Sequence, residues 1–465
     1  MDKFSFLNSA HTSFFAEMYD QYLESPDSLE PSWKAFFQGF DFGLESANIT
    51  VEEKKFEVPE NISKEFKVVN LIDAYRQRGH LFTITNPVRE RRKYSPTLEI
   101  ENFGLDKTDL NLVFSAGEVV GIGPDKLSNI IDHLQKIYCQ SIGLEYMYIR
   151  DPEKVKWIQS FINVNSNQPR FSKSEKLSIL DSLNKAYTFE NFLQKKYVGQ
   201  KRFSLEGGES LIPAIDFLIN SAAENGVEEF VMGMSHRGRL NTLANIFGKS
   251  SRDIFGEFEG KDYEEDIFDG DVKYHLGWTS ERTTSSGKKI NMNLAPNPSH
   301  LESVDPIVQG ITRAKLENNF DNNTNKVLPL IVHGDAAVAG QGVVYEVVQM
   351  SRLKGYSTGG TIHLIVNNQV GFTTNYLDAR SSTYCSDVGK VTLSPVIHVN
   401  SDDVEAVIHS VTFALEYRNK FNRDVFIDLL GYRKYGHNEG DEPRFTQPKL
   451  YKYCLLYTSP SPRDR

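Results

Sequence analysis

From about residue 200 onward, short apolar runs alternate with amphipathic stretches, and this alternation constrains the fold more than any other feature of the sequence. The runs with strand length are "EEFVMGM" (228–234), "KVLPLIV" (326–332), "TIHLIVN" (361–367) and "DVFIDLL" (424–430). Helical patterns lie between them: "RLNTLANIFG" (239–248), "GVVYEVVQMSRLKG" (342–355) and "SDDVEAVIHSVTFALEYRNKF" (401–421), the last with Ser401 as expected N-cap. The pattern predicts an α/β fold with a parallel sheet covered by helices on both faces.

Ligands of such sheets bind at the carboxyl ends of the strands, and polar residues follow two of the predicted strands there. Asp335 ends the first, and Asn367 and Asn368 end the next, about thirty residues later, which is the length of one strand-helix-strand crossover. A carboxylate, an amide oxygen and a backbone carbonyl would suit Mg²⁺. Small residues beside Asp335 leave room for a diphosphate, namely Ala336, Ala337, Gly340 and Gly342. Alternatively, Asp335 caps the following helix and the asparagines form a turn.

A second strand-to-helix turn, "MSHRGRL", concentrates positive charge in His236, Arg237 and Arg239. "KYHLG" adds His275, and "NPSHLE" adds His300. Because the formal net charge is -10, an anionic substrate would need such a local basic pocket. Histidine can also carry a proton near neutral pH. The alternative is a salt-bridged surface loop with ordinary interior histidines.

"KYGHNEGDEP" follows the last predicted strand, so His437 and Glu439 also approach the carboxyl edge. They fit a wall of the site or a structural ionic cluster equally well. Neither is assigned a catalytic role.

Composition excludes several classes of protein. The negative net charge argues against a generic nucleic-acid binder. No stretch is long and apolar enough to span a bilayer, and the first residues lack the pattern of a secretory signal or an Arg-rich transit peptide. Three widely separated cysteines fit neither a disulfide framework nor a zinc site. We therefore expect a cytoplasmic location.

The N-terminal region carries two short aromatic helices. Phe15, Met18, Tyr19 and Tyr22 share one helical face, and Trp33, Phe36, Phe37 and Phe40 share another. These faces indicate either a partner-docking arm or packing on the domain behind. Residues 45–65 read as a polar linker, and residues 66–165 as mainly helical.

Several motifs resemble those of one enzyme family. "HGDA", a crossover and "NNQ" resemble the thiamine diphosphate motif of the transketolase and 2-oxoacid dehydrogenase group, whose usual form is GDG followed by NN. Ala336 replaces the last glycine, a departure typical of one branch. The longer stretches "HGDAAVAGQGVVYEVVQMS", "NNQVGFTTN", "HRGRLNTLANIFGK", "KRFSLEGGESLIP" and "GHNEGDEP" closely resemble the E1 components of 2-oxoglutarate dehydrogenases. The similarity runs from the N-terminal arm to about Tyr453.

The resemblance implies roles for ten residues. Asp335, Asn368 and the carbonyl of Val370 would hold Mg²⁺. His236 and His275 would be catalytic and would contact the substrate together with Arg237. The residues implied to bind thiamine diphosphate are Arg237, Ser299, Leu301, Asp335, Ala336, Ala337 and Asn368.

The resemblance also implies an activity and partners. The expected reaction is oxidative decarboxylation of 2-oxoglutarate with succinyl transfer to the lipoyl group of E2, in the tricarboxylic acid cycle. E2 and E3 would be partners in a complex, and the full-length protein would be a homodimer, with no nucleic acid or membrane partner. The alternatives are an E1 specific for 2-oxoadipate or another 2-oxoacid, transketolase, or a non-catalytic E2-docking fragment.

The expected domains are a docking arm (1–44), a linker (45–65), a helical domain (66–165) and a cofactor-binding α/β domain (166–453). Residues 454–465, "CLLYTSPSPRDR", leave the family pattern and are expected to be a non-native tail. The family's second domain supplies the glutamate that activates the cofactor. We expect that domain to be absent from this chain and the chain alone to be inactive.

Overall fold

The computed structural model describes residues 12–45, 60–89, 93–260 and 271–457. The chain forms two compact units. The first, the helical unit, contains residues 1–82 and 93–139, and the second, the sheet unit, contains residues 83–92 and 140–465. Of the helices within the described ranges, none combines the length and apolar character that crossing a membrane requires.

The helical unit is built on four α-helices: α1 (Thr12–Glu24), α2 (Pro31–Glu45), α3 (Glu60–Arg78) and α4 (Leu127–Tyr138). A short antiparallel pair, β1 (Val113–Phe114) and β2 (Asp125–Lys126), precedes α4. Ile130, Leu134 and Ile137 recur at helical spacing on α4 and are buried. The first residues of α3, from Glu60, fall inside the expected linker, so that prediction is wrong for residues 60–65. Residues 46–59 lie outside the described residues.

The aromatic residues of α2 pack within the helical unit. The ring of Trp33 stacks on Phe37, with centroids 5.6 Å apart, and meets Phe66 of α3 edge-on at 5.8 Å. Trp33 and Phe37 are fully buried, whereas Phe42 is 71% exposed. Intramolecular packing therefore accounts for the most buried aromatic residues, and a docking role is left to the exposed ones. The side chain of Phe15 lies outside the described residues.

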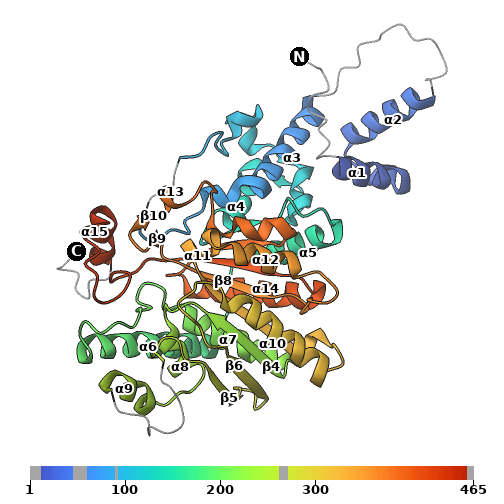
Figure 1. The fold of residues 1–465 in the computed structure, drawn as a ribbon. Coiled ribbons are helices and arrows are strands. Elements are labelled where there is room, and N and C mark those ends of the chain that lie inside the picture. The colour runs from blue at the N-terminus through green and yellow to red at the C-terminus, as the bar shows by residue number, and fades with distance from the viewer. Residues whose placement is uncertain (1–11, 46–59, 90–92, 261–270, 458–465) are drawn as a thin grey trace. The chain divides into compact units, whose positions relative to one another are not determined.

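The sheet unit is centred on one large sheet (Figure 1). Within the described part of the chain it has the strand order β3-β11-β12-β8-β7-β4-β6-β5. The strands from β11 to β6 in this order run parallel, while β3 and β5 pair antiparallel at the two edges. In chain order the strands are β3 (Ile142–Glu145), β4 (Glu229–Met234), β5 (Trp278–Thr283), β6 (Lys289–Leu294), β7 (Val327–Gly334), β8 (Ile362–Asn367), β11 (Val396–Asn400) and β12 (Val425–Leu430).

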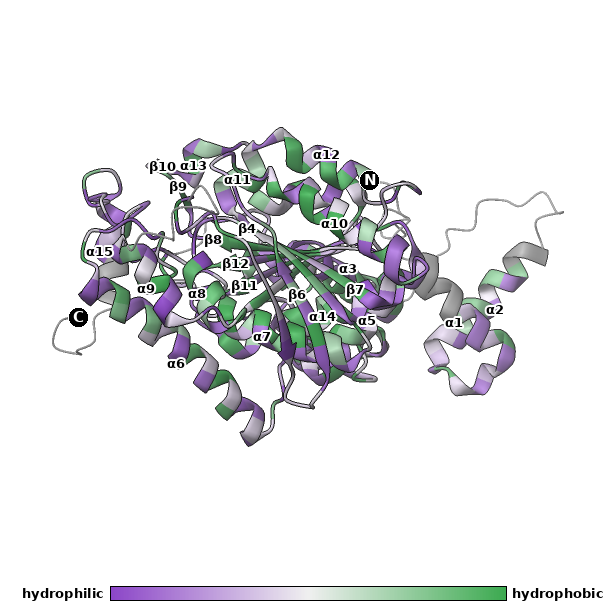
Figure 2. Cartoon of the chain, turned by 60° about the horizontal axis from the view of Figure 1, so that its bottom comes forward, coloured by the Kyte–Doolittle hydropathy of each residue, from purple (hydrophilic) through white to green (hydrophobic). Residues whose placement is uncertain are grey.

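Helices cover both faces of this sheet, because its central strands are apolar on both sides. Every residue of β4, β8 and β12 is buried, as expected for parallel strands between two helical layers. Figure 2 shows α10 (Val304–Asn319), α11 (Asp335–Gly340) and α12 (Gly342–Met350) on one side. On the other side lie α7 (Leu211–Glu224), α8 (Arg239–Asn245) and α14 (Val404–Phe421). The remaining helices are α5 (Pro152–Asn163), α6 (Lys173–Lys196), α9 (Ser251–Glu259), α13 (Tyr376–Ala379) and α15 (Pro448–Tyr457).

The α/β fold class is confirmed, with corrections at several elements. The four predicted strands are present, but β3, β5, β6 and β11 were not anticipated. β3 lies within residues 66–165, and residues 140–165 belong to the sheet unit rather than to a separate helical region. The expected N-cap Ser401 is wrong. Asp403 caps α14 by accepting the N–H of Ala406 at 3.1 Å, whereas the N–H of Ser401 bonds to Leu430 O at the end of β12.

Candidate active site

A cavity of about 770 Å³ opens at the carboxyl edge of the central parallel strands. Its wall includes residues that directly follow β4, β7 and β8 and a residue shortly after β12, because parallel neighbouring strands bring these ends together. Residues named from the sequence line it: His236, Arg237, Ser299, Leu301, Asp335, Ala336, Ala337, Asn368 and Val370. His275 does not line the cavity itself, but its ring packs on His236. His300 is exposed and does not line the cavity.

Asp335 begins α11 directly after β7 and is only 3% exposed. Burial raises the pKa of its carboxyl group to about 6, against the lowering effect of Arg380. Among the described residues, Asp335 forms no ion pair. A buried carboxylate without a paired cation is costly to ionise, and a bound cation would remove that cost.

The loop after β8 separates the two asparagines. Asn367 points into the sheet, where its amide donates to Asp428 at 2.8 Å, and its side-chain oxygen accepts the N–H of Gln369 at 3.0 Å. Asn368 lines the cavity, and its oxygen accepts the N–H of Val370 at 3.3 Å. The two asparagines therefore form a turn, which was the alternative interpretation of the sequence. One of them, Asn368, also presents its amide oxygen at the cavity.

Gly371 lets this loop lie against the start of α11. A Cβ at residue 371 would lie 2.6 Å from the Cβ of Ala336, closer than such atoms can approach. The methyl group of Ala336, which replaces the more usual glycine, is therefore accommodated only because residue 371 has no side chain. This contact holds the Asp335 and Asn368 segments together.

Two histidines stack on each other at the cavity, and His236 lines its wall. The rings of His236 and His275 are 5.0 Å apart, and Phe203 stacks on the other side of His236 at 5.2 Å. Burial, together with the nearby His275, Arg239 and Lys201, lowers the pKa of His236 to about 4. Its Nε2 is buried and has no hydrogen-bond partner among the described residues. His236 is therefore a neutral imidazole at physiological pH with one ring nitrogen unsatisfied.

His275 is held by two polar neighbours. Its Nδ1 lies 3.0 Å from a carboxylate oxygen of Asp271, and its Nε2 lies 3.3 Å from Oγ of Ser299. Since Ser299 lines the cavity, His275 reaches it through this hydroxyl group. The carboxylate fixes the ring orientation and favours a proton on Nδ1.

The arginines of the "HRGR" turn are not surface residues. Arg239 is fully buried, and its guanidinium donates to the carbonyl oxygens of Leu276 (2.8 Å) and Ala295 (2.7 Å). Arg237 lines the cavity but donates to Ser204 O at 2.7 Å and to His437 O at 2.8 Å. The alternative of a salt-bridged surface loop is thus wrong. Both arginines clamp backbone segments around the histidine pair.

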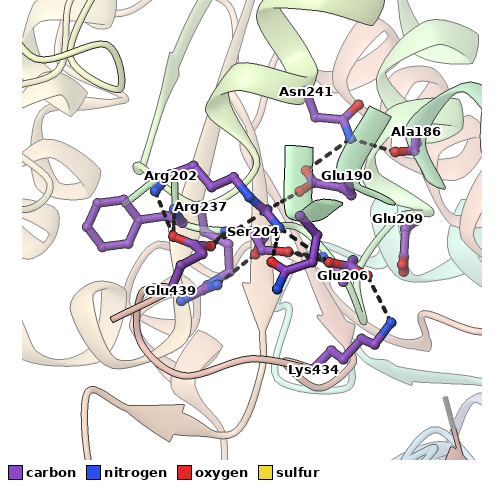
Figure 3. A network of polar contacts seen from close by, with 12 residues as sticks. Ala186, Glu190, Arg202, Ser204, Glu206, Glu209, Arg237, Asn241, Lys434 and Glu439 are labelled. Atoms are coloured by element: carbon purple, nitrogen blue, oxygen red, sulfur yellow. Dashed lines mark hydrogen bonds and ion pairs between the residues drawn. The ribbon is translucent and has the colours of Figure 1, made fainter. Parts of the chain in front are cut away.

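Glu439 holds one wall of the cavity in place without lining it. Its carboxylate accepts the backbone N–H groups of Arg202 (2.6 Å), Phe203 (3.1 Å) and Ser204 (2.8 Å), as Figure 3 shows. The side chain of Arg202 lies in the same buried network and donates to Glu190 at 2.6 Å. Phe203 has a φ of 54°, a left-handed conformation that a bulky residue adopts only when its surroundings enforce it. Glu439 is therefore structural, while His437 forms part of the wall.

The cavity residues that were not anticipated from the sequence include Lys201, Phe203 and Arg433. Arg433 is buried, donates to Phe372 O at 2.7 Å and follows β12 by three residues. The strand-end rule that selected Asp335 could have selected it. Lys201 and Phe203 follow no strand, and only the tertiary contact between residues 201–204 and 437–439 brings them here.

The donor set fits a hard divalent cation beside an anionic ligand. Asp335 offers a carboxylate, Asn368 an amide oxygen and Val370 a backbone carbonyl, which are oxygen ligands of the kind Mg²⁺ takes. Lys201, Arg237 and Arg433 add positive charge around the same cavity. The arrangement can hold a metal-bound diphosphate beside Asp335 and an anionic substrate beside the neutral imidazole of His236.

Two known protein families match this chain. Residues 182–459 match the family described as "Dehydrogenase E1 component", and residues 4–44 match "2-oxoglutarate dehydrogenase N-terminus". The first match extends past Tyr453, where the resemblance was expected to end.

Individual relatives agree with the family matches. The chain is 42% identical to the 2-oxoglutarate dehydrogenase E1 component of Azotobacter vinelandii, over 96% of this chain and 50% of that protein. It is 42% identical to the protein of the same name from Haemophilus influenzae, over 98% and 50%. It is 41% identical to the mitochondrial 2-oxoglutarate dehydrogenase of Saccharomyces cerevisiae, over 96% and 47%. The chain spans about half the length of these curated relatives, and it belongs to the dehydrogenase E1 component family.

Proposed function

We propose that this chain provides the metal and diphosphate half of an E1 active site that decarboxylates 2-oxoglutarate and passes the succinyl group to the lipoyl group of E2. The dehydrogenase E1 component family depends on thiamine diphosphate. The main support is one juxtaposition: the carboxylate of Asp335, which no described residue pairs as an ion, and the oxygen of Asn368 share a cavity with the neutral imidazole of His236.

Asp335, Asn368 and the carbonyl of Val370 would hold Mg²⁺, and the metal would anchor the diphosphate of the cofactor. Ser299, Leu301, Ala336 and Ala337 line the same cavity and would contact the cofactor. When bound, thiamine diphosphate supplies the carbon nucleophile and the electron sink for loss of CO₂.

The part of the cavity wall that carries His236 would bind and orient the substrate. 2-Oxoglutarate carries two carboxylates, and Lys201, Arg237 and Arg433 place positive charge around the cavity. His236, neutral at pH 7, can donate or accept a hydrogen bond at the keto oxygen and can hold a proton there during the reaction. His275, oriented by Asp271, would assist through Ser299.

The expected partners follow from the same proposal. E2 would receive the succinyl group, E3 would reoxidise the lipoyl group, and the complete enzyme would be a homodimer. The match of residues 4–44 to the 2-oxoglutarate dehydrogenase N-terminus supports an arm that associates with E2.

Calorimetric titration of the full chain with Mg²⁺ and thiamine diphosphate tests the cofactor site. We expect saturable heat that requires both components. Absence of heat would favour a non-catalytic E2-docking fragment. Titrating the loaded chain with 2-oxoglutarate, 2-oxoadipate and pyruvate then tests the substrate, and tightest binding of 2-oxoadipate would contradict the proposed specificity.

A further inference from the structure

A second, smaller cavity of about 270 Å³ lies in the sheet unit, away from the candidate active site. Thr392 and Leu393, just before β11, and Arg423, just before β12, line it. Because β11 and β12 run parallel to β8 and β7, these residues mark the amino edge of the sheet. The active-site cavity opens at the carboxyl edge, so the two cavities lie at opposite ends of the strands.

Positive charge dominates the lining of this cavity. Arg150 precedes α5, Arg352 follows α12, and Arg423 joins α14 to β12, so three elements distant in sequence each contribute one guanidinium. Within the described ranges, none of these three forms an ion pair with a carboxylate. Lys154 also lines the cavity, but it pairs with Asp151, the only acidic residue of the lining.

Two of the arginines are close enough to influence each other. Burial and the neighbouring charge of Arg352 lower the pKa of Arg423. Asp424 lies next to Arg423 in sequence, but it does not line the cavity, and its carboxylate accepts the N–H of Thr361 at 2.8 Å. Asp424 and Asp151 offset only part of this positive charge, so a bound anion would reduce the remaining repulsion between the guanidinium groups.

A buried hydroxyl group completes the site. Tyr417, on α14, lines the cavity with an exposed fraction of 0%, and its phenolic oxygen has no hydrogen-bond partner among the described residues. Buried hydroxyl groups are normally satisfied, so an orphaned one inside a cationic cavity indicates a missing acceptor.

We propose that this cavity is an anion site for a phosphate group, carried either by inorganic phosphate or by a small phosphate monoester. Planar guanidinium groups match phosphate oxygens in bidentate geometry, and the Tyr417 hydroxyl adds a neutral donor. Three arginines and a hydroxyl offer more donors than a single carboxylate can accept. The volume is below the roughly 300–1,000 Å³ typical of pockets for drug-sized ligands, which favours a small ion.

Calorimetric titration of the full chain with inorganic phosphate and with glycerol phosphate tests the site. We expect saturable binding that weakens about 10-fold or more in Arg423→Gln and in Arg352→Gln, since hydrogen bonds to charged groups are among the stronger ones. Tyr417→Phe removes one neutral donor and should weaken binding about 3- to 10-fold. Tighter binding of inorganic phosphate would identify a free ion, and tighter binding of glycerol phosphate would identify a monoester.

Lys354→Gln is the matched control, because Lys354 is exposed, lies two residues from Arg352 and does not line the cavity. It should leave the affinity unchanged. Equal weakening in Lys354→Gln and Arg352→Gln would show a diffuse surface charge and overturn the proposal. Absence of phosphate binding, or equally tight binding of succinate at the same residues, would overturn it as well.

Discussion

At the residue scale, Asp335 combines two properties that oppose each other in the metal-free protein. Its carboxyl group is buried, which raises its pKa to about 6, yet the site needs the ionised form. Between about pH 4 and pH 6 the unfolded chain has lost this proton while the folded chain keeps it, so folded-state stability falls as pH rises through that range. Cation binding and proton binding therefore compete at Asp335.

Asp335→Asn should have opposite effects on stability and on cofactor binding. Removing the buried charge should raise the free energy of unfolding of the metal-free chain at pH 7 by about 1–3 kcal/mol. The same change should abolish Mg²⁺-dependent binding of thiamine diphosphate, because the anionic ligand is gone. Denaturant unfolding and calorimetry measure the two effects. Asp378→Asn, at an exposed position of the same cavity, should change neither, and unchanged cofactor affinity in Asp335→Asn would remove the basis of the metal site.

His236 should remain neutral throughout the physiological pH range. Its resonance in a histidine NMR titration should have a midpoint near pH 4, because burial and nearby cations disfavour the protonated ring. His236→Gln should weaken 2-oxoglutarate binding about 10-fold while leaving thiamine diphosphate affinity unchanged. A midpoint near 6.5, or loss of folding in the variant, would indicate an ordinary core histidine instead.

At the element scale, the site depends on how tightly segments from different elements approach one another. The loop after β8 rests on the start of α11 through Gly371, and residues 202–204 are fixed by Glu439. Neither contact involves a side chain that touches the reacting atoms. Each instead determines where a cavity residue lies, so changes here should alter the site at a distance.

Gly371→Ala should separate Asn368 from Asp335. The added Cβ would meet Ala336 at 2.6 Å, and overpacking of this kind costs about 1–3 kcal/mol. We expect Mg²⁺-dependent cofactor affinity to fall about 10-fold, measured by calorimetry. Gly256→Ala, where nothing lies within 4 Å of an added Cβ, is the control and should leave affinity unchanged. Equal affinities in the two variants would argue against the loop contact.

Glu439→Gln should loosen the segment that carries Phe203. A buried carboxylate that accepts three backbone N–H groups is lost, which should reduce the free energy of unfolding by about 1–3 kcal/mol. Amide hydrogen exchange at residues 202–204 should accelerate selectively. Glu442→Gln, which removes an exposed carboxylate in the same segment, should leave the free energy of unfolding almost unchanged. Unaltered exchange at residues 202–204 would contradict the clamp.

At the scale of the whole molecule, the helical unit and the sheet unit carry separable features. The residues proposed to bind the cofactor and the substrate all lie in the sheet unit. The aromatic arm belongs to the helical unit, where Trp33 and Phe37 are buried and Phe42 is exposed. Association with E2 and chemistry at the cofactor should therefore respond to different substitutions.

Phe42→Ser should weaken co-elution with E2 without changing thermal stability, because its side chain is 71% exposed. Trp33→Ala should lower the melting temperature, since removing a buried tryptophan costs about 3–5 kcal/mol. Calorimetric cofactor affinity should be unchanged in both variants. If the Phe42→Ser variant has normal stability and still co-elutes with E2 to the full extent, the exposed part of the arm is not the docking surface.

The sequence by itself determined the fold class and the identity of the strand-end residues. Strand-length apolar runs separated by helical patterns have few ways to bury both faces, and parallel strands then place Asp335, Asn368 and His236 at one edge. β6, "KINMNL", alternates polar and buried apolar residues, which is a strand signal that the sequence did offer. The edge strand β5, "WTSERT", is mostly polar, so its local signal is weak and pairing with β6 supplies it.

Only the tertiary structure decided which of these residues face the cavity. Asn367 and Asn368 are adjacent in sequence, yet one bonds to Asp428 in the sheet and the other reaches the cavity, because a turn at Gln369 directs them apart. The sequence left open whether Arg237 and Arg239 belong to a charged surface loop. In the structure, backbone carbonyl oxygens of distant segments accept their hydrogen bonds. Lys201 and Phe203 reach the cavity because Glu439, more than two hundred residues away in sequence, accepts the backbone N–H of Phe203. Which residues face the cavity depends on contacts between segments that are distant in sequence. These contacts form only where the gain from burial exceeds the cost of desolvation in the complete fold, so the local sequence does not encode them.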